Sequence, residues 1–223
     1  MVINSESGMS KFFTKVYLWM FIGLLISGGV AYYTSVTPSM WYFVFNNYTW
    51  ILLAELLVVI VFSFLRKKVS PVVAMLLFVL YSGISGLTLS SIFLLYRLDS
   101  VGMVFLSAAV MFALLAIYGY VTKQDLSSLG KILIFALLAI IIMSLVNLFI
   151  GNSTFSIIVS IISVVVFLGL TAWDMQALKA MYNYYASDEK ELNKIAIYGA
   201  LDLYLDFINI FLSLLNLFGK SKD

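Results

Sequence analysis

Three aspartates lie within the last two long apolar stretches of this 223-residue chain. Asp174 follows the letters "LGLTAW", and Asp202 and Asp206 lie in "GALDLYLDFINIF" (199–211). A carboxylate in the hydrocarbon core of a membrane is costly, so it normally faces a protein interior or an aqueous path and marks a functional site. The chain has no histidine, the usual titrating side chain at physiological pH. Proton sensing near neutral pH would therefore depend on carboxylates.

The composition of the chain is that of a polytopic membrane protein. Hydrophobic residues make up 63% of it and charged residues only 11%, a balance that soluble globular domains do not have. The absence of cysteine excludes disulfides and sulfur-ligated metals, and the absence of histidine excludes Ser-His and Cys-His catalytic pairs. We therefore expect neither an enzyme nor a nucleic-acid-binding protein, and no bound cofactor.

The apolar runs predict seven transmembrane helices, because a span needs about 20 mostly apolar residues. The expected ranges are 16–36, 50–66, 72–96, 101–121, 131–150, 155–176 and 195–218. A six-span version, in which the last stretch is re-entrant, is the alternative, but it would put more positive charge on the outer side. An aromatic interfacial loop is expected at 34–47 and a long hydrophilic connection at 183–194. Ser82, Gly86 and Ser90, spaced by four residues, predict close helix packing. The expected fold class is an all-α membrane protein, with the whole chain as a single polytopic membrane domain.

Local signals predict where two of the helices begin. Ser10 is of a residue type that caps helix N-termini, and it precedes the first apolar run. Asp188 and Glu191 have the spacing of a capping box, in which the first side chain accepts a hydrogen bond from the backbone N–H three residues on. We therefore expect the first helix to begin after Ser10 and the seventh to extend into the cytosol.

Basic residues set the expected orientation of the chain. Ten lysines and arginines lie near the N-terminus or around the connections after the second, fourth and sixth spans, whereas Arg97, Lys220 and Lys222 lie on the other side. Positive residues concentrate in cytoplasmic loops. We expect an integral protein of the cytoplasmic membrane, with its N-terminus in the cytoplasm and its C-terminus outside.

The seventh span carries a polar face along nearly its whole length. Its polar positions recur every three or four residues, which places them on one side of a helix. These positions are Tyr198, Asp202, Asp206, Asn209, Ser213 and Asn216. Such a seam can serve packing alone, but two carboxylates in its cytoplasmic half favour a solvated path or gate. We therefore expect this span at the centre, with the other six around it.

Other ionisable groups are expected at a similar depth. Asp206 lies about 16 Å along its span from the cytoplasmic end. Asp174 lies near the cytoplasmic end of the sixth span, where it meets Asp206 or reaches interfacial water, and Arg66 ends the second span on the same side. Two carboxylates brought together there would share a proton and titrate as a pair. Glu55 is expected about one turn inside the outer end of the second span, where it lines an outer vestibule or reaches water.

Four segments resemble one known family. They are "SGLTLSSIF" (85–93), "TAWDMQ" (171–176), "KIAIYGAL" (194–201) and "LYLDFINIFLSLL" (203–215), and the basic "RKKVSP" after the second span fits as well. Together they are similar to the Bax inhibitor-1, or transmembrane Bax inhibitor motif, family in a short bacterial form. The resemblance covers essentially all seven spans. It implies six helices around a central seventh, in a bacterial cytoplasmic membrane.

The resemblance also implies a function, that of a pH-sensitive calcium leak channel. In this family an aspartate pair acts as the pH sensor, and an arginine from the second helix acts as a latch. By motif, Asp174 and Asp206 fit the aspartate pair, and Arg66 fits the latch. Glu55 falls where an acidic pore residue is expected, whereas Asp202 has no assigned counterpart.

The polar face of the seventh span suits calcium, which prefers several oxygen ligands. The expected ion path comprises Glu55, Asp202, Asn209 and Ser213, with the aspartate pair as the candidate calcium contact. A leak requires weak binding, so a sparse site is sufficient. The expected partners are calcium ions, protons and membrane lipid. The sequence leaves the oligomeric state open, with a monomer as one option.

Three other functions remain open at this point. An intramembrane aspartyl protease also has one aspartate on each of two successive helices, but it uses Gly-x-Gly-Asp and Pro-Ala-Leu elements that the chain lacks; Asp202 follows Gly199, Ala200 and Leu201. A proton-coupled transporter would give saturable, proton-driven uptake and no passive calcium flux. A purely structural or partner-regulating membrane protein would tolerate the neutralisation of both aspartates.

Overall fold

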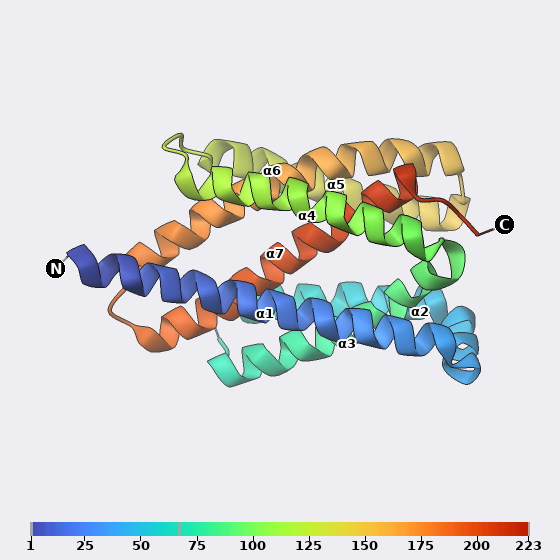
Figure 1. Ribbon diagram of the computed structural model, residues 1–223, viewed down its shortest axis with the longest axis horizontal. Coiled ribbons are helices and arrows are strands. Elements are labelled where there is room, and N and C mark those ends of the chain that lie inside the picture. Colours follow the sequence, from blue (N-terminus) through green and yellow to red (C-terminus); the bar gives the residue numbers. More distant parts are fainter. Residues whose placement is uncertain (1, 67, 223) are drawn as a thin grey trace. The chain divides into compact units, whose positions relative to one another are not determined.

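Seven long helices make up almost all of the part of the chain that is described. The computed structural model describes residues 2–66 and 68–222, and its helices follow one another through short connections (Figure 1). Their bounds are α1 Val2–Val36, α2 Pro38–Leu65, α3 Pro71–Leu95, α4 Leu98–Val121, α5 Ser127–Ile150, α6 Ser153–Tyr185 and α7 Glu189–Phe218. Each helix is long and apolar enough to cross a membrane. The predicted all-α fold with seven transmembrane helices is confirmed.

The helices begin and end at residues that suit these positions. α2 and α3 each begin with proline, whose missing N–H is not needed in a first turn. Ser70 caps α3, because its hydroxyl accepts a hydrogen bond from the backbone N–H of Val73 at 3.4 Å. α5 ends at Ile150, and the next residue, Gly151, has a φ of 69° in the left-handed region that glycine adopts without penalty. Asp188 accepts a hydrogen bond from the Glu191 N–H at 2.9 Å, as the predicted capping box requires.

The segment 34–47 is helical apart from Thr37, so the interfacial loop predicted there was wrong. α1 continues to Val36 and α2 begins at Pro38. The two asparagines that suggested a loop donate to carbonyl oxygens one turn back in α2, Asn46 to Tyr42 and Asn47 to Phe43, each at 2.9 Å. Each asparagine thus bonds to the backbone of its own helix.

The other predicted boundaries were mostly too narrow, because hydropathy marks the apolar part of a helix and not its polar ends. α1 extends back to Val2, so Ser10 lies inside the helix and does not cap it. α6 continues to Tyr185, nine residues past the predicted end, and α7 begins at Glu189. The long connection expected at 183–194 is therefore a short turn. Lysine, glutamate and alanine are good helix formers, so the helices continue through this polar segment.

The chain divides into two compact units, and α7 contributes to both. The first unit runs through Tyr96 and includes residues 182–204 and Lys222; the second comprises residues 97–181 and 205–221. α7 is the most buried helix, with 72% of an 18-residue apolar stretch buried, against 6% for α2. Two expectations depend on how the units are joined: that the chain is a single membrane domain, and that α7 lies at its centre. Both stay predictions.

In the first unit, α1 packs closely along α3. Ser82, Gly86 and Ser90 of α3 are buried, as their spacing predicted. A Cβ atom on Gly86 would lie 2.7 Å from the carbonyl oxygen of Ser27 and 2.7 Å from Cβ of Val30, both on α1. Such distances are shorter than any normal contact, so glycine is required where the two backbones approach.

This approach predicts opposite effects for two glycines of α3. Gly86→Ala is expected to destabilise the protein by about 1–3 kcal/mol, because the added methyl group overlaps α1. Gly83→Ala is the matched control, since no atom of the described residues lies within 4 Å of a Cβ there, and alanine favours a helix over glycine by up to about 1 kcal/mol. Thermal unfolding in detergent micelles measures both variants. Equal melting temperatures would contradict the close packing.

In the second unit, aromatic contacts hold the C-terminal half of α7. The ring of Phe207 meets the rings of Phe105 and Phe112 on α4 edge to face, with centroids 5.1 and 5.8 Å apart. A Cβ atom on Gly119 of α4 would overlap the backbone of Ala172 on α6. Tight packing of α4 against α6 and α7 fixes the rotation of α7 in this unit and hence the direction of its polar face.

Candidate functional site

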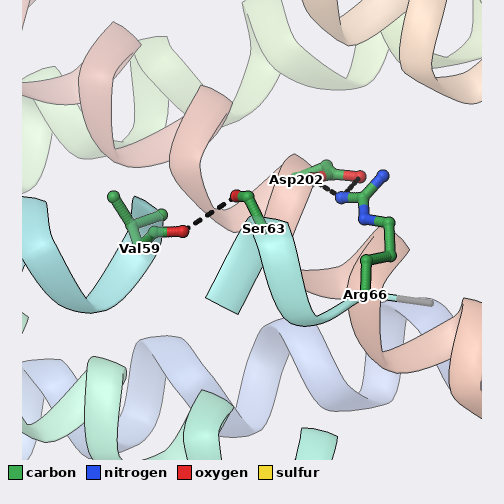
Figure 2. A network of polar contacts seen from close by, with 4 residues as sticks. All are labelled: Val59, Ser63, Arg66 and Asp202. Atoms are coloured by element: carbon green, nitrogen blue, oxygen red, sulfur yellow. Dashed lines mark hydrogen bonds and ion pairs between the residues drawn. The ribbon is translucent and has the colours of Figure 1, made fainter. Parts of the chain in front are cut away.

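An ion pair in the first unit joins the end of α2 to α7. Nη2 of Arg66 donates to both carboxylate oxygens of Asp202, at 2.5 and 2.7 Å (Figure 2). The guanidinium also lies over the ring of Tyr198, one turn earlier on α7, with 5.1 Å between its central carbon and the ring centroid. Phe62 packs against the same ring at 4.7 Å. The two charged side chains keep exposures of 37% and 27%, so the pair is only partly shielded from solvent.

Arg66 reaches Asp202 because α2 ends directly before it. Arg66 follows Leu65, the last residue of α2, where the unpaired carbonyl groups of the helix favour a positive charge. One turn earlier, the Ser63 hydroxyl donates to the Val59 carbonyl oxygen at 2.8 Å, within α2 itself (Figure 2). The partner of Arg66 is thus Asp202, an aspartate that was expected on the ion path and not as the partner of the latch.

Asp174 and Asp206, the predicted pH sensor, both lie in the second unit. Asp206 on α7 is buried, with 3% of its surface exposed, and Asp174 on α6 is half-buried. α6 continues to Tyr185, so Asp174 is not at a helix end. Arg66, their expected counter-charge, makes its hydrogen bonds to Asp202. A shared proton on the pair, and a calcium ion bound to it, stay predictions.

Glu55 lies in the middle of α2, so its expected place near the outer end was wrong. It is about 25 Å along the helix from Pro38 and about 15 Å from Leu65. The error follows from the loop predicted at 34–47, which is in fact the start of α2. The Glu55 carboxylate points to α3 and not to the membrane surface. It accepts hydrogen bonds from Thr88 Oγ1 at 2.9 Å and from Tyr81 OH at 3.2 Å, both on α3.

Aromatic packing connects this carboxylate to α7 within the first unit. The ring of Tyr81 meets the ring of Tyr204 edge to face at 6.0 Å, and Phe78 meets the same ring at 5.9 Å. Tyr204 is fully buried and lies two residues past Asp202. Glu55 contacts Tyr81, and Tyr81 contacts Tyr204, so these contacts link α2, α3 and α7. A movement of α7 would therefore disturb the surroundings of Glu55.

Polar side chains of α5, α6 and α7 line a cavity of about 360 Å³ in the second unit. Asn209 and Ser213, predicted for the ion path, are both in its wall. The sequence reasoning missed five polar wall residues on the other two helices, which are Ser144, Asn147, Ser156, Ser160 and Ser163. Those of α6 are spaced by four and three residues, a helical stripe that the sequence does contain.

The polar groups of the structure do not form a dedicated metal site. Within residues 2–66 and 68–222, no three histidine, cysteine, aspartate or glutamate side chains come close enough to hold a metal ion together. A cation entering this part of the chain would meet carboxylates one or two at a time, together with neutral oxygens. Such an arrangement favours weak and transient binding.

Comparisons with known proteins identify one family. Residues 9–223 match the model of the family described as inhibitor of apoptosis-promoting Bax1. The inner membrane protein YbhL of Escherichia coli K12 is 41% identical over 99% of this chain and 96% of its own length. Uncharacterized proteins of Borreliella burgdorferi and Deinococcus radiodurans are 40% and 41% identical, over 96% and 95% of this chain and 94% and 91% of their own lengths. None of these names gives an enzymatic activity. With its seven membrane-spanning helices, the chain is an integral membrane protein that belongs to the Bax inhibitor-1 family.

Proposed function

We propose that this protein is a calcium leak channel of the bacterial cytoplasmic membrane and that it responds to pH through Asp174 and Asp206. The observation that carries the proposal is the burial of Asp206 on α7, the most buried helix. An ionisable group at such a position is costly and is normally retained for a function. Gain or loss of its proton changes the charge where little water is present to compensate.

The polar face of α7 supplies the ion path. Asp206, Asn209 and Ser213 offer carboxylate, amide and hydroxyl oxygens in succession along one side of the helix. Calcium binds such oxygens in flexible numbers and geometries. Glu55 adds a carboxylate at mid-helix in α2, held by two hydroxyl groups of α3. The path is sparse enough for an ion to leave as well as to enter.

Arg66 acts in this proposal as a latch on α7 through Asp202. The pair holds the end of α2 against α7 as long as the Asp202 carboxylate is ionised. A proton on Asp202 removes one of the two charges and weakens the attachment. Two arrangements of α7, with the latch closed or open, then differ in their protonation, which is the property a pH-dependent gate needs.

The orientation in the proposal follows from the basic residues. Ten of the 13 lysines and arginines lie near the chain's N-terminus or around the connections that follow α2, α4 and α6. These positions face the cytoplasm under the positive-inside rule. The N-terminus is therefore cytoplasmic, the turn between α5 and α6 faces outward, and so does the C-terminus.

Calcium flux in proteoliposomes, measured against pH, tests this function. Asp206→Asn and Asp174→Asn are each expected to flatten the pH profile, because each removes one titratable member of the pair. Asp99→Asn is the matched control, since Asp99 is an exposed carboxylate paired with Arg97. Passive flux without a proton gradient separates a channel from a proton-coupled transporter. A wild-type profile in both test variants would overturn the proposed sensor.

A further inference from the structure

The cavity in the second unit is large and polar for a site within membrane helices. Its volume of about 360 Å³ corresponds to roughly twelve water molecules at about 30 Å³ each. Eight of its twelve wall residues carry a hydroxyl or an amide, and none carries a charge. Empty cavities in proteins are apolar, whereas polar cavities of this size hold water. The wall chemistry thus favours water over lipid chains as the content.

Hydrogen bonds orient the two amides of α7 in this wall. Nδ2 of Asn216 donates to the hydroxyls of Ser156 and Ser160, at 3.0 and 2.8 Å. Nδ2 of Asn209 donates to the carbonyl oxygen of Leu205 at 2.8 Å. Asn216 thus uses both of its side-chain N–H groups on α6 and Asn209 uses one on its own helix, and each amide has a carbonyl oxygen that can accept from water or bind a cation. An oxygen wall of this kind suits a cation or its hydration water.

The same face of α7 continues from the cavity to a carboxylate. Asp206, Asn209, Ser213 and Asn216 are spaced by three, four and three residues, which places them on one side of the helix. All four belong to the second unit. Ser213 is about 10 Å along the helix from Asp206. The neutral oxygens of the cavity therefore lead along α7 to the carboxyl group of Asp206.

We propose that this cavity is the water-filled outer vestibule of the ion path, where neutral oxygens receive a hydrated cation before it reaches Asp206. The inference rests on the proposed function, since it names the outer segment of the same path. It also assigns a use to Ser156, Ser160 and Asn216, whose hydrogen bonds hold the wall together. A lipid headgroup in the cavity is the competing occupant.

The chain has no cysteine, so single cysteines can report water in the cavity. Ser160→Cys and Ser213→Cys place a thiol at two buried wall positions with little change in size. Spheroplasts that express the full chain are treated from outside with trimethylammonioethyl or sulfonatoethyl methanethiosulfonate. These two membrane-impermeant reagents are similar in size, and they carry a positive and a negative charge. The reaction needs a thiolate, which forms in water and not in hydrocarbon.

Two further serines provide the control and the reference. Ser107 is exposed on α4, outside the cavity wall, about 14 Å from the outer end of its helix, and Ser160 is about 10 Å from the outer end of α6. Ser107→Cys therefore shows how fast a cysteine reacts at a similar depth when it does not line the cavity. Ser153 is exposed at the outer start of α6. Ser153→Cys therefore serves as the reference: it gives the ratio of the reaction rates of the cationic and the anionic reagent with an exposed thiol.

We expect both wall cysteines to react at least about tenfold faster than Ser107→Cys, since a thiol in hydrocarbon stays protonated. At alkaline pH, the cationic reagent is expected to be favoured about tenfold beyond the Ser153→Cys ratio at Ser213→Cys, because the negative charge of Asp206, about 10 Å away along the helix, attracts it. The preference should be smaller at Ser160→Cys, whose serine bonds Asn216, about 15 Å along the helix from Asp206. Adding Asp206→Asn should abolish this preference and leave the accessibility unchanged.

Wall cysteines that react no faster than Ser107→Cys, or that show no preference for the cationic reagent, would overturn the vestibule. Labelling needs no calcium flux, so absent flux with the expected labelling would defeat the proposed function alone.

Discussion

Arg66→Gln is expected to raise the calcium leak about tenfold at neutral pH, because it removes the ion pair that holds the end of α2 to α7. A fully buried pair loses about 3–5 kcal/mol when one partner is removed, and an exposed pair less than about 1 kcal/mol. The exposures of 37% and 27% place the Arg66–Asp202 pair between these limits. We take about 1.4 kcal/mol, which corresponds to a tenfold change in the equilibrium between the two states.

Asp202→Asn is expected to act in the same direction, and the double variant is expected to add little to either single one. Both changes remove the same interaction, so their effects do not add. Lys68→Gln is the matched control, because Lys68 is exposed beside the same turn and lies outside the ion pair. Flux from equal amounts of reconstituted protein measures all four variants. Additive effects of Arg66→Gln and Asp202→Asn, or an equal effect of Lys68→Gln, would refute the latch.

The latch also gives the sign of its own contribution to the pH response. The pair is complete while Asp202 is ionised, and it is lost as the pH falls and the carboxylate takes up a proton. The leak that this pair restrains should therefore rise on acidification. In Arg66→Gln this part of the pH response should be absent, because the carboxylate no longer has a latch to release. The response that depends on Asp206 would remain.

The seven spans and the polar face of α7 could be predicted because both are local properties of the sequence. Apolar runs of sufficient length define spans, and a spacing of three or four residues defines a helix face. The partner of Arg66 is not a local property. Asp202 and Asp206 are one turn apart on the same face, so the register of α2 against α7 decides which of them the guanidinium meets. No residue in either segment encodes that register by itself.

The cavity shows a different limit of sequence reasoning. Ser156, Ser160 and Ser163 form a readable stripe on α6, but hydroxyl groups in membrane helices often bond to a carbonyl of their own helix and then signal nothing more. Thr171 does so, donating to the Phe167 carbonyl oxygen at 2.8 Å. What marks the serine stripe as part of a cavity wall is its contact with Asn216, which donates hydrogen bonds to Ser156 and Ser160. These serines are 60 and 56 residues from Asn216 in the chain, so the contact cannot be read from the local sequence.

Glu55→Gln and Glu55→Leu are expected to separate ion conduction from packing. The glutamine keeps an oxygen that can accept from Thr88 and Tyr81, so its stability should stay within about 1 kcal/mol of wild type. It removes a negative charge from mid-membrane, however, and calcium flux should fall about tenfold if this charge lies on the ion path. The leucine removes charge and acceptor together. It should lower both flux and stability, the latter by about 1–3 kcal/mol, because the buried Tyr81 hydroxyl loses its acceptor. The Thr88 hydroxyl keeps its hydrogen bond to the Ser85 carbonyl oxygen at 2.8 Å.

Ser63→Ala is the matched control for both variants of Glu55. Ser63 lies on the same helix, is exposed, and uses its hydroxyl on the Val59 carbonyl oxygen of α2. Its removal should change neither flux nor stability. Flux in proteoliposomes and thermal unfolding in detergent give the two readouts for each variant. Wild-type flux in Glu55→Gln would take Glu55 off the ion path, and an unchanged melting temperature in Glu55→Leu would show that the contacts with α3 contribute nothing to stability. If neither variant changed flux or stability, the burial of Glu55 would have no physical reason, because a charge in hydrocarbon persists only where binding or function offsets its cost.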